Sequence, residues 1–171
     1  MNAFLRLVSA LASERTRYVL VGVAGVNYYA TSGATLFTTK DRDLFLPPDP
    51  ENLLTAWRTI EAQGLQLWAG DEPLGKPLDR FLADRVVERK ALTKATDDEG
   101  LEVDLTFVMA GFEFDEVWRE RRVFRVEGVE IPVARLTHIV TSKAKANRPK
   151  DRLFLETHAE ALKDLMDDSG I

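Results

Sequence analysis

The stretch TTKDRDLFLP, residues 38–47, places two aspartates at the start of an apolar run. In a β-strand, residues two positions apart point to the same face. Asp41 and Asp43 therefore project together with Thr39, while Arg42 and the leucines after it point the other way, toward the core. Two carboxylates this close repel each other, and a bound divalent cation such as Mg²⁺ removes the conflict. The alternative is that both aspartates are simply solvated at the start of the strand.

A second strand supplies a third acid. The stretch EGLEVDLTFV, residues 99–108, alternates between apolar and polar residues, and Asp104 belongs to the polar set. If this strand lies beside the one that carries Asp41 and Asp43, three carboxylates share one face of a sheet. That is the donor set of a two-metal phosphoryl-transfer site. A strand whose outer face meets water explains the pattern equally well.

Two further stretches indicate phosphate binding. RYVLVG, residues 17–22, reads as a short buried strand that Gly22 ends, and such a turn lets a phosphate approach the backbone closely. A tight turn without a ligand is the alternative. TSKAKANRPKDR, residues 141–152, is a basic cluster in an acidic chain. At helical spacing Lys143 and Lys145 lie on different faces, so one of them can face inward to a triphosphate, unless this is an ordinary solvated helix pair.

The remaining pattern predicts an α+β fold. Strands are expected over residues 17–22, 41–46, 64–70, 86–94 and 101–107, with hairpins through 97–100 and over 123–134. Helices are expected near 4–11, over 23–33, 49–64 and 112–119, and from 136 onward with a break near 149. We expect residues 1–134 to form the α+β domain and residues 135–171 to form a C-terminal helical extension packed on it.

Composition excludes several classes of protein. The 171 residues carry a net charge of −5, contain no cysteine and include two histidines. Bulk DNA binding, cysteine-based metal sites and thiol nucleophiles are therefore not expected. No apolar stretch has the length of a membrane span, and the N-terminus reads as an amphipathic helix rather than a signal peptide. These features predict a cytoplasmic protein without a membrane partner.

Taken in order, the motifs resemble the nucleotidyltransferase superfamily (polymerase-beta-like). The matching stretches are VLVGVAGVNYYA (19–30), TTKDRDLFL (38–46) and LEVDLTF (101–107). The late stretch SKAKANRPKDRLFLETHAEAL (142–162) is similar to the helical tail of the bacterial branch related to abortive-infection toxin nucleotidyltransferases. The resemblance covers about residues 15–165 and implies a nucleotidyltransferase-like mixed sheet flanked by helices, with C-terminal helices.

The resemblance also implies an activity. A nucleoside monophosphate would move from an NTP to a hydroxyl group on a protein, RNA or small molecule, with Mg²⁺ or Mn²⁺ as the cofactor. The implied catalytic residues and metal ligands are Asp41, Asp43 and Asp104, with Asp104 as the base. The implied nucleotide-binding residues are Gly22, Thr39, Lys143 and Lys150. A toxin–antitoxin system is the implied setting, with an antitoxin or a second copy of the chain as the partner.

Two positions depart from the family pattern. Val23 stands where the family has a second small residue, and a valine side chain cannot hold a phosphate oxygen. Arg42 stands between the aspartates where the family has an apolar residue, so we expect its strand at an edge of the sheet. These departures leave open a catalytically weakened nucleotide-binding or regulatory module of the same fold. A metal-dependent hydrolase that uses the same carboxylates is a third interpretation.

Overall fold

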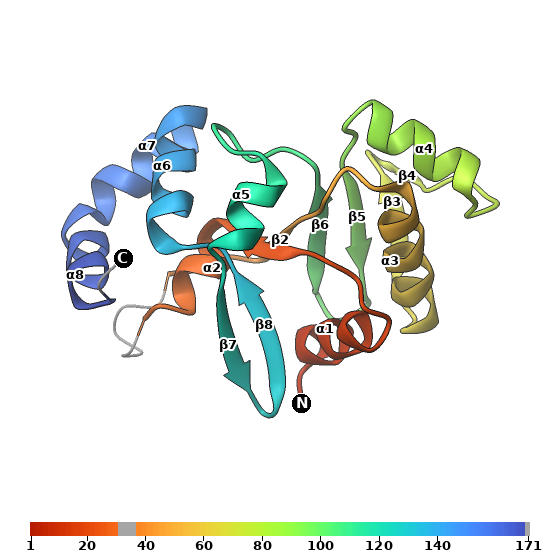
Figure 1. The fold of residues 1–171 in the computed structure, drawn as a ribbon, viewed down its shortest axis with the longest axis horizontal. Coiled ribbons are helices and arrows are strands. Elements are labelled where there is room, and N and C mark those ends of the chain that lie inside the picture. The colour runs from red at the N-terminus through yellow and green to blue at the C-terminus, as the bar shows by residue number, and fades with distance from the viewer. Residues whose placement is uncertain (31–36, 170–171) are drawn as a thin grey trace.

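A computed structural model describes residues 1–30 and 37–169 and shows a mixed α+β fold (Figure 1). In the described residues, eight strands form one sheet in the order β4-β3-β5-β6-β2-β1-β8-β7. The strands are β1 (Val19–Val21), β2 (Asp41–Phe45), β3 (Gln66–Ala69), β4 (Glu72–Pro73), β5 (Thr93–Thr96), β6 (Glu102–Thr106), β7 (Arg122–Val126) and β8 (Val129–Val133). The helices are α1 (Ala3–Ser13), α2 (Gly22–Asn27), α3 (Pro50–Ala62), α4 (Arg80–Glu88), α5 (Phe114–Arg119), α6 (Leu136–Ala146), α7 (Pro149–Thr157) and α8 (Ala159–Ser169).

The middle of the sheet is built from β1, β2 and β6. β2 pairs antiparallel with β1 and parallel with β6, so it lies inside the sheet. The expectation of an edge strand for Arg42 is therefore wrong. The Arg42 guanidinium finds its partner in an aromatic ring instead, because its carbon lies 4.9 Å from the centre of the Phe4 ring of α1. This cation–π contact compensates a half-buried charge in an interior strand.

One face of the sheet is covered by α1 and α3, which contact each other. α1 begins after Asn2, whose side chain accepts a hydrogen bond from the Leu5 backbone N–H, and it buries its apolar stripe. α3 begins after Asp49, as the sequence predicts, and it fully buries Trp57. The Trp57 indole N–H donates to the Thr93 hydroxyl at 3.2 Å, which satisfies its polar atom inside the core.

The opposite face is covered only in part. α5 lies over the end of β2, where Phe45 and Phe114 pack at a centroid distance of 5.5 Å. α2 and α6 contact each other beyond β1. Between these helices, the first residues of β2 stay uncovered: Asp41 is exposed and Asp43 is half-buried, while Leu44 and Phe45 are buried. The polar start of β2 therefore lies in a gap between helices.

Both predicted hairpins are confirmed. β5 and β6 pair antiparallel across the acidic turn at residues 97–100, with Thr96 opposite Glu102. β7 and β8 pair antiparallel, and both turn residues, Glu127 and Gly128, have positive φ. Figure 1 shows the β7–β8 hairpin projecting from the body of the molecule.

Three predicted boundaries differ from the structure. The strand expected over 86–94 is wrong in its first half, because α4 occupies Arg80–Glu88 and β5 begins only at Thr93. The Asp79 side chain accepts from the Leu82 backbone N–H and starts that helix, and Ala83 and Val86 are buried one turn apart. The last predicted helix is divided at His158 into α7 and α8. α2 ends at Asn27, and the expected helix end near residue 33 lies outside the described residues.

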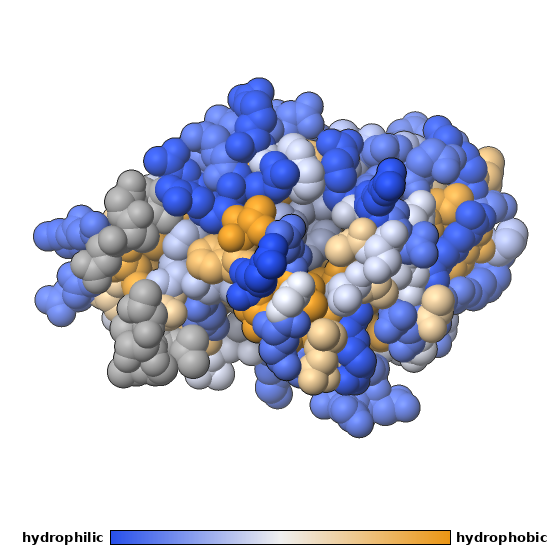
Figure 2. All heavy atoms as spheres, turned by 60° about the horizontal axis from the view of Figure 1, so that its bottom comes forward, coloured by the Kyte–Doolittle hydropathy of each residue, from blue (hydrophilic) through white to orange (hydrophobic). Residues whose placement is uncertain are grey.

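The surface is mixed in character. Figure 2 shows a face on which hydrophilic residues predominate and hydrophobic ones gather toward its middle. Large hydrophobic side chains that are exposed include Val123 on the projecting hairpin. Among the described residues, every helix is too short or too polar to cross a lipid bilayer.

Candidate functional site

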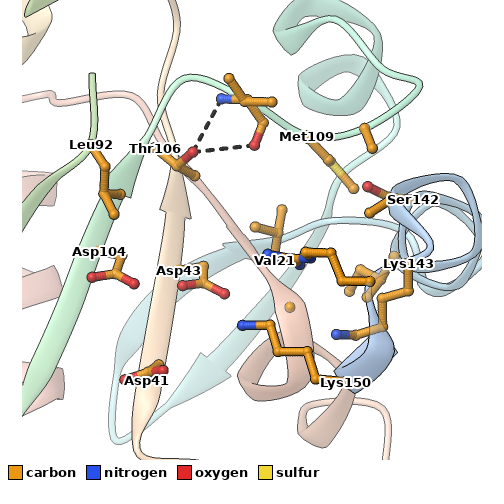
Figure 3. A pocket seen from close by; sticks show the side chains of 16 residues that line it. Val21, Asp41, Asp43, Leu92, Asp104, Thr106, Met109, Ser142, Lys143 and Lys150 are labelled. Carbon is orange, nitrogen blue, oxygen red and sulfur yellow. Dashed lines mark hydrogen bonds between the residues drawn. The ribbon is translucent and has the colours of Figure 1, made fainter. Parts of the chain in front are cut away.

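The two acid-bearing strands lie side by side in a register that pairs their aspartates. β2 and β6 are parallel neighbours, and Asp43 is the direct Cα partner of Asp104. Paired residues of adjacent strands point to the same face and lie about 5 Å apart. Asp41 lies two positions earlier on β2 and opens to the same cavity (Figure 3). The predicted convergence of Asp41, Asp43 and Asp104 on one face of the sheet is therefore present.

The Asp43 carboxyl is the most perturbed acid of the site. Burial raises its pKa from 3.8 to about 6, and the negative charges of Asp104 and Asp41 raise it further in the same direction. The positive charge of Lys143 acts against them. A carboxyl held in this way binds a proton or a cation more readily than an ordinary aspartate.

The Asp104 carboxylate is half-buried between two strands. Its Oδ1 atom is buried and accepts no hydrogen bond from the residues that the structure describes. The closest positive charge is Lys94 on β5, whose Nζ lies 3.6 Å from that oxygen. An acceptor atom of this kind has unused capacity for a cation.

Gly22 brings the backbone close to the acids. It is the first residue of α2, directly after β1, and its φ is +72°. A Cβ atom at this position would lie 2.5 Å from Oδ2 of Asp43. Glycine is therefore required twice here, for the positive φ and for the space that the Asp43 carboxyl occupies. The sequence indicated the glycine turn but not its contact with Asp43.

Basic side chains line the opposite wall of the same cavity, which has a volume of about 520 Å³. Lys143 of α6 and Lys150 of α7 extend toward the aspartates in Figure 3. Lys145 is exposed, and its side chain lies against the position where a Cβ of Gly111 would be. Lys143 is thus the inward-facing member of the pair that the helical spacing separates. The volume is typical of a small-molecule site.

A buried acid holds this basic wall in place. Asp151 of α7 is 1% exposed, and it accepts from Nε of Arg148 at 2.7 Å. Its Oδ1 lies 3.6 Å from Nζ of Lys143. Although burial raises the pKa of Asp151, the hydrogen bonds and charge of Arg148 and the charge of Lys143 bring it below its ordinary value. Asp151 therefore links α6 to α7 as an ionised carboxylate.

Burial has the opposite effect on the lysine. It lowers the pKa of Lys143, and the charges of Asp151 and Asp43 act against it. The Asp151 link was missed as a contact at the sequence level, although its position three residues after Arg148 matches an acid in the first turn of a helix.

The rim of the cavity is apolar on the side of β5 and β6. Leu92 and Val108 line it and are 49% and 58% exposed. The Thr106 hydroxyl accepts from the Val108 backbone N–H at 3.1 Å and fixes the turn after β6. These residues carried no signal in the sequence, because an apolar residue next to a strand is expected in the core.

Three other predicted positions lie beside the cavity rather than in its wall, as far as the described residues define that wall. The Thr39 hydroxyl lies 3.3 Å from the Asp41 backbone N–H, so it supports the start of β2. Val23 is half-buried in α2 and packs against the core. Arg42 points to the other face of the sheet, toward Phe4.

The carboxylates suit a divalent cation by chemistry more than by present geometry. In the described part of the chain, no three acidic or histidine side chains are already arranged as a metal site. The raised pKa of Asp43 and the free buried oxygen of Asp104 are nevertheless what hard oxygen donors show when a cation would stabilise them. Asp41 is exposed, so its side chain has room to turn toward such an ion.

A scan of the sequence against protein-family models gave no match, and a search of curated proteins gave none either. The likeness to nucleotidyltransferases accordingly rests on the motifs and on the positions of their residues.

Proposed function

We propose that this protein is a metal-dependent nucleotidyltransferase, which moves a nucleoside monophosphate from an NTP to a hydroxyl acceptor on a protein, RNA or small molecule. One observation carries the proposal. Asp43 and Asp104 are partners in adjacent parallel strands, and they face Lys143 and Lys150 across one cavity. Acids on one wall and bases on the other are what a triphosphate and its cation require.

The acidic wall is the place for Mg²⁺ or Mn²⁺. Asp41, Asp43 and Asp104 would hold the cation, which when bound neutralises phosphate charge and polarises the reacting phosphoryl group. Without it, the Asp43 carboxyl is partly protonated near neutral pH, because its pKa is about 6. Cation binding and proton release are therefore coupled at this residue.

The basic wall is the place for the phosphates. Lys150 is exposed at the cavity, and Lys143 is half-buried beside the Asp151 carboxylate. Their ammonium groups would bind the β- and γ-phosphates and orient the α-phosphorus toward the acids. Gly22 leaves the floor of the cavity without a side chain at that point.

The reaction is a single displacement. The acceptor oxygen attacks the α-phosphorus, and the bond from that phosphorus to the oxygen bridging to the β-phosphorus breaks. The electron pair of that bond leaves with pyrophosphate, and Asp104 receives the hydroxyl proton. Asp104 suits this role because its Oδ1 atom accepts no hydrogen bond from the described residues.

The proposal is tested by label transfer. The protein is incubated with each α-³²P-labelled NTP and Mg²⁺ or Mn²⁺, in the presence of RNA and protein from a cell extract. We expect label on one class of acceptor together with pyrophosphate release, and loss of both in Asp43→Asn and Asp104→Asn. The exposed Asp98→Asn serves as the matched control. Release of orthophosphate without label transfer would instead identify a hydrolase.

A second function is favoured by one observation. Val23 occupies the position of a phosphate-holding small residue and packs against the core instead. A nucleotide-binding or regulatory module of the same fold would give a cation-dependent rise in Tm with an NTP but no turnover in the label assay. The implied partner, an antitoxin or a second copy of the chain, is tested by the mass of the complex on size-exclusion chromatography with light scattering.

A further inference from the structure

Lys94 extends the row of charged residues across the sheet. The β5–β6 hairpin pairs Lys94 with Asp104, and β6 pairs Asp104 with Asp43. Three neighbouring strands therefore present lysine, aspartate and aspartate side by side. The lysine approaches Asp104 from the strand on the side away from Asp43.

The position of Lys94 is fixed by the sheet. β5 lies between β3 and β6, and the residues on either side of Lys94, Thr93 and Ala95, are 1% and 0% exposed. Its Nζ is 3.6 Å from the buried Oδ1 of Asp104. The Lys94 ammonium therefore cannot leave the acids without abandoning an ordered strand, whereas an exposed lysine on a loop can.

The charges around Lys94 favour its ammonium form. Partial burial lowers its pKa, but the charges of Asp104, Glu102 and Asp41 outweigh burial and raise the pKa above its ordinary value. The lysines of the opposite wall are placed differently, since Lys143 lies beside Asp151. Lys94 is thus a cation assigned to the third carboxylate of the site.

We propose that Lys94 takes the place of a second metal ion: the site binds one divalent cation at Asp41 and Asp43, and the Lys94 ammonium neutralises Asp104. This inference rests on the proposed function. One divalent cation and one ammonium balance the three carboxylates, whereas two divalent cations beside Lys94 would leave an excess of positive charge. Lys94 is a positioning residue, because it acts through Asp104.

Removal of the ammonium should open the second ion site. In Lys94→Met the Asp104 carboxylate loses its partner, so we expect two Mn²⁺ ions per chain instead of one. The first ion should bind roughly three- to tenfold more tightly, because one positive charge has been removed from its surroundings. Lys94→Arg keeps the charge and should keep one ion per chain.

The test is a Mn²⁺ titration of the full chain without nucleotide, followed by electron paramagnetic resonance of the free ion. Lys163→Met, an exposed lysine of α8, changes the net charge by the same amount and should leave affinity and stoichiometry as in the wild type. Circular dichroism checks that every variant is folded. Thermal unfolding gives a second readout: metal-free Lys94→Met should have a lower Tm than the wild type and should gain more on addition of Mn²⁺.

The outcomes separate this inference from the proposed function. If Mn²⁺ binds the wild type, is lost in Asp43→Asn and behaves identically in Lys94→Met, the role of Lys94 is overturned and the metal site stands. Two ions per chain in the wild type overturn the role of Lys94 as well. If no variant binds Mn²⁺ at millimolar concentration, the metal-dependent function itself is overturned, and the inference with it.

Discussion

Replacement of Asp43 by asparagine should stabilise the metal-free protein at neutral pH. The pKa of this carboxyl is about 6 in the folded chain, against an ordinary value of 3.8. The fold therefore favours the protonated, neutral form. Its contribution to stability is fully present below about pH 4 and is lost as the pH rises through 6. Asparagine has nearly the same shape and stays neutral at every pH.

The size of the effect follows from the two pKa values. Their difference corresponds to about 3 kcal/mol at pH 7.5, and this is an upper bound because Asp43 is only half-buried and water screens part of the repulsion. For a chain of 171 residues, each kcal/mol raises Tm by roughly 3 °C. The variant should thus gain up to about 9 °C at pH 7.5 and almost nothing at pH 4.

The assay is urea unfolding in EDTA at half-unit steps from pH 4 to pH 8, for the wild type, Asp43→Asn and the exposed-site control Asp98→Asn. The free-energy difference between Asp43→Asn and the wild type should rise across pH 4–6 and then level off. Addition of Mg²⁺ should reduce it, because the ion stabilises only the wild-type site. A difference that is flat with pH, or a variant less stable than the wild type at pH 7.5, would refute the reasoning about charge repulsion.

Three further substitutions have defined outcomes. Gly22→Ala should cost about 2 kcal/mol or more in urea unfolding, since it adds a Cβ at positive φ that meets Asp43 Oδ2, and part of this cost should disappear in an Asp43→Ala background. Asp151→Asn should cost about 3 kcal/mol at pH 7, because it leaves Arg148 without its buried partner; the cost should shrink as the pH falls below about 4, where the wild-type carboxyl also loses its charge. Leu105→Ala removes a fully buried side chain of β6 and should lower the unfolding free energy by about 2–5 kcal/mol with an unchanged m-value.

The central strands could be predicted because their periodicity is local. β6 alternates between buried apolar residues and half-buried polar ones, as the sequence indicates. The pairing of Asp43 with Asp104 is different in kind. These residues are far apart in the chain, and only the tertiary contact of β2 with β6 fixes their register, so the sequence could make the pairing a condition but not a result.

The salt bridge of Lys94 had a usable signal that a wrong boundary concealed. The acidic turn of the β5–β6 hairpin pairs Thr96 with Glu102, and counting back by two places Lys94 opposite Asp104. The expected strand over 86–94 ended at this lysine and gave it no partner. Two neighbouring valines favoured a strand there, but the Asp79 cap and the burial of Ala83 and Val86 decided for a helix.

The contact between Arg42 and Phe4 bears on how the protein can be dissected. Phe4 belongs to α1, and Arg42 lies between the two aspartates that open to the cavity. A fragment that begins at β1 would keep every acid of the site, yet it would strip the aromatic cover from a guanidinium beneath them and uncover the apolar side of the sheet. The smallest piece on which metal or nucleotide binding can be measured therefore includes the first helix.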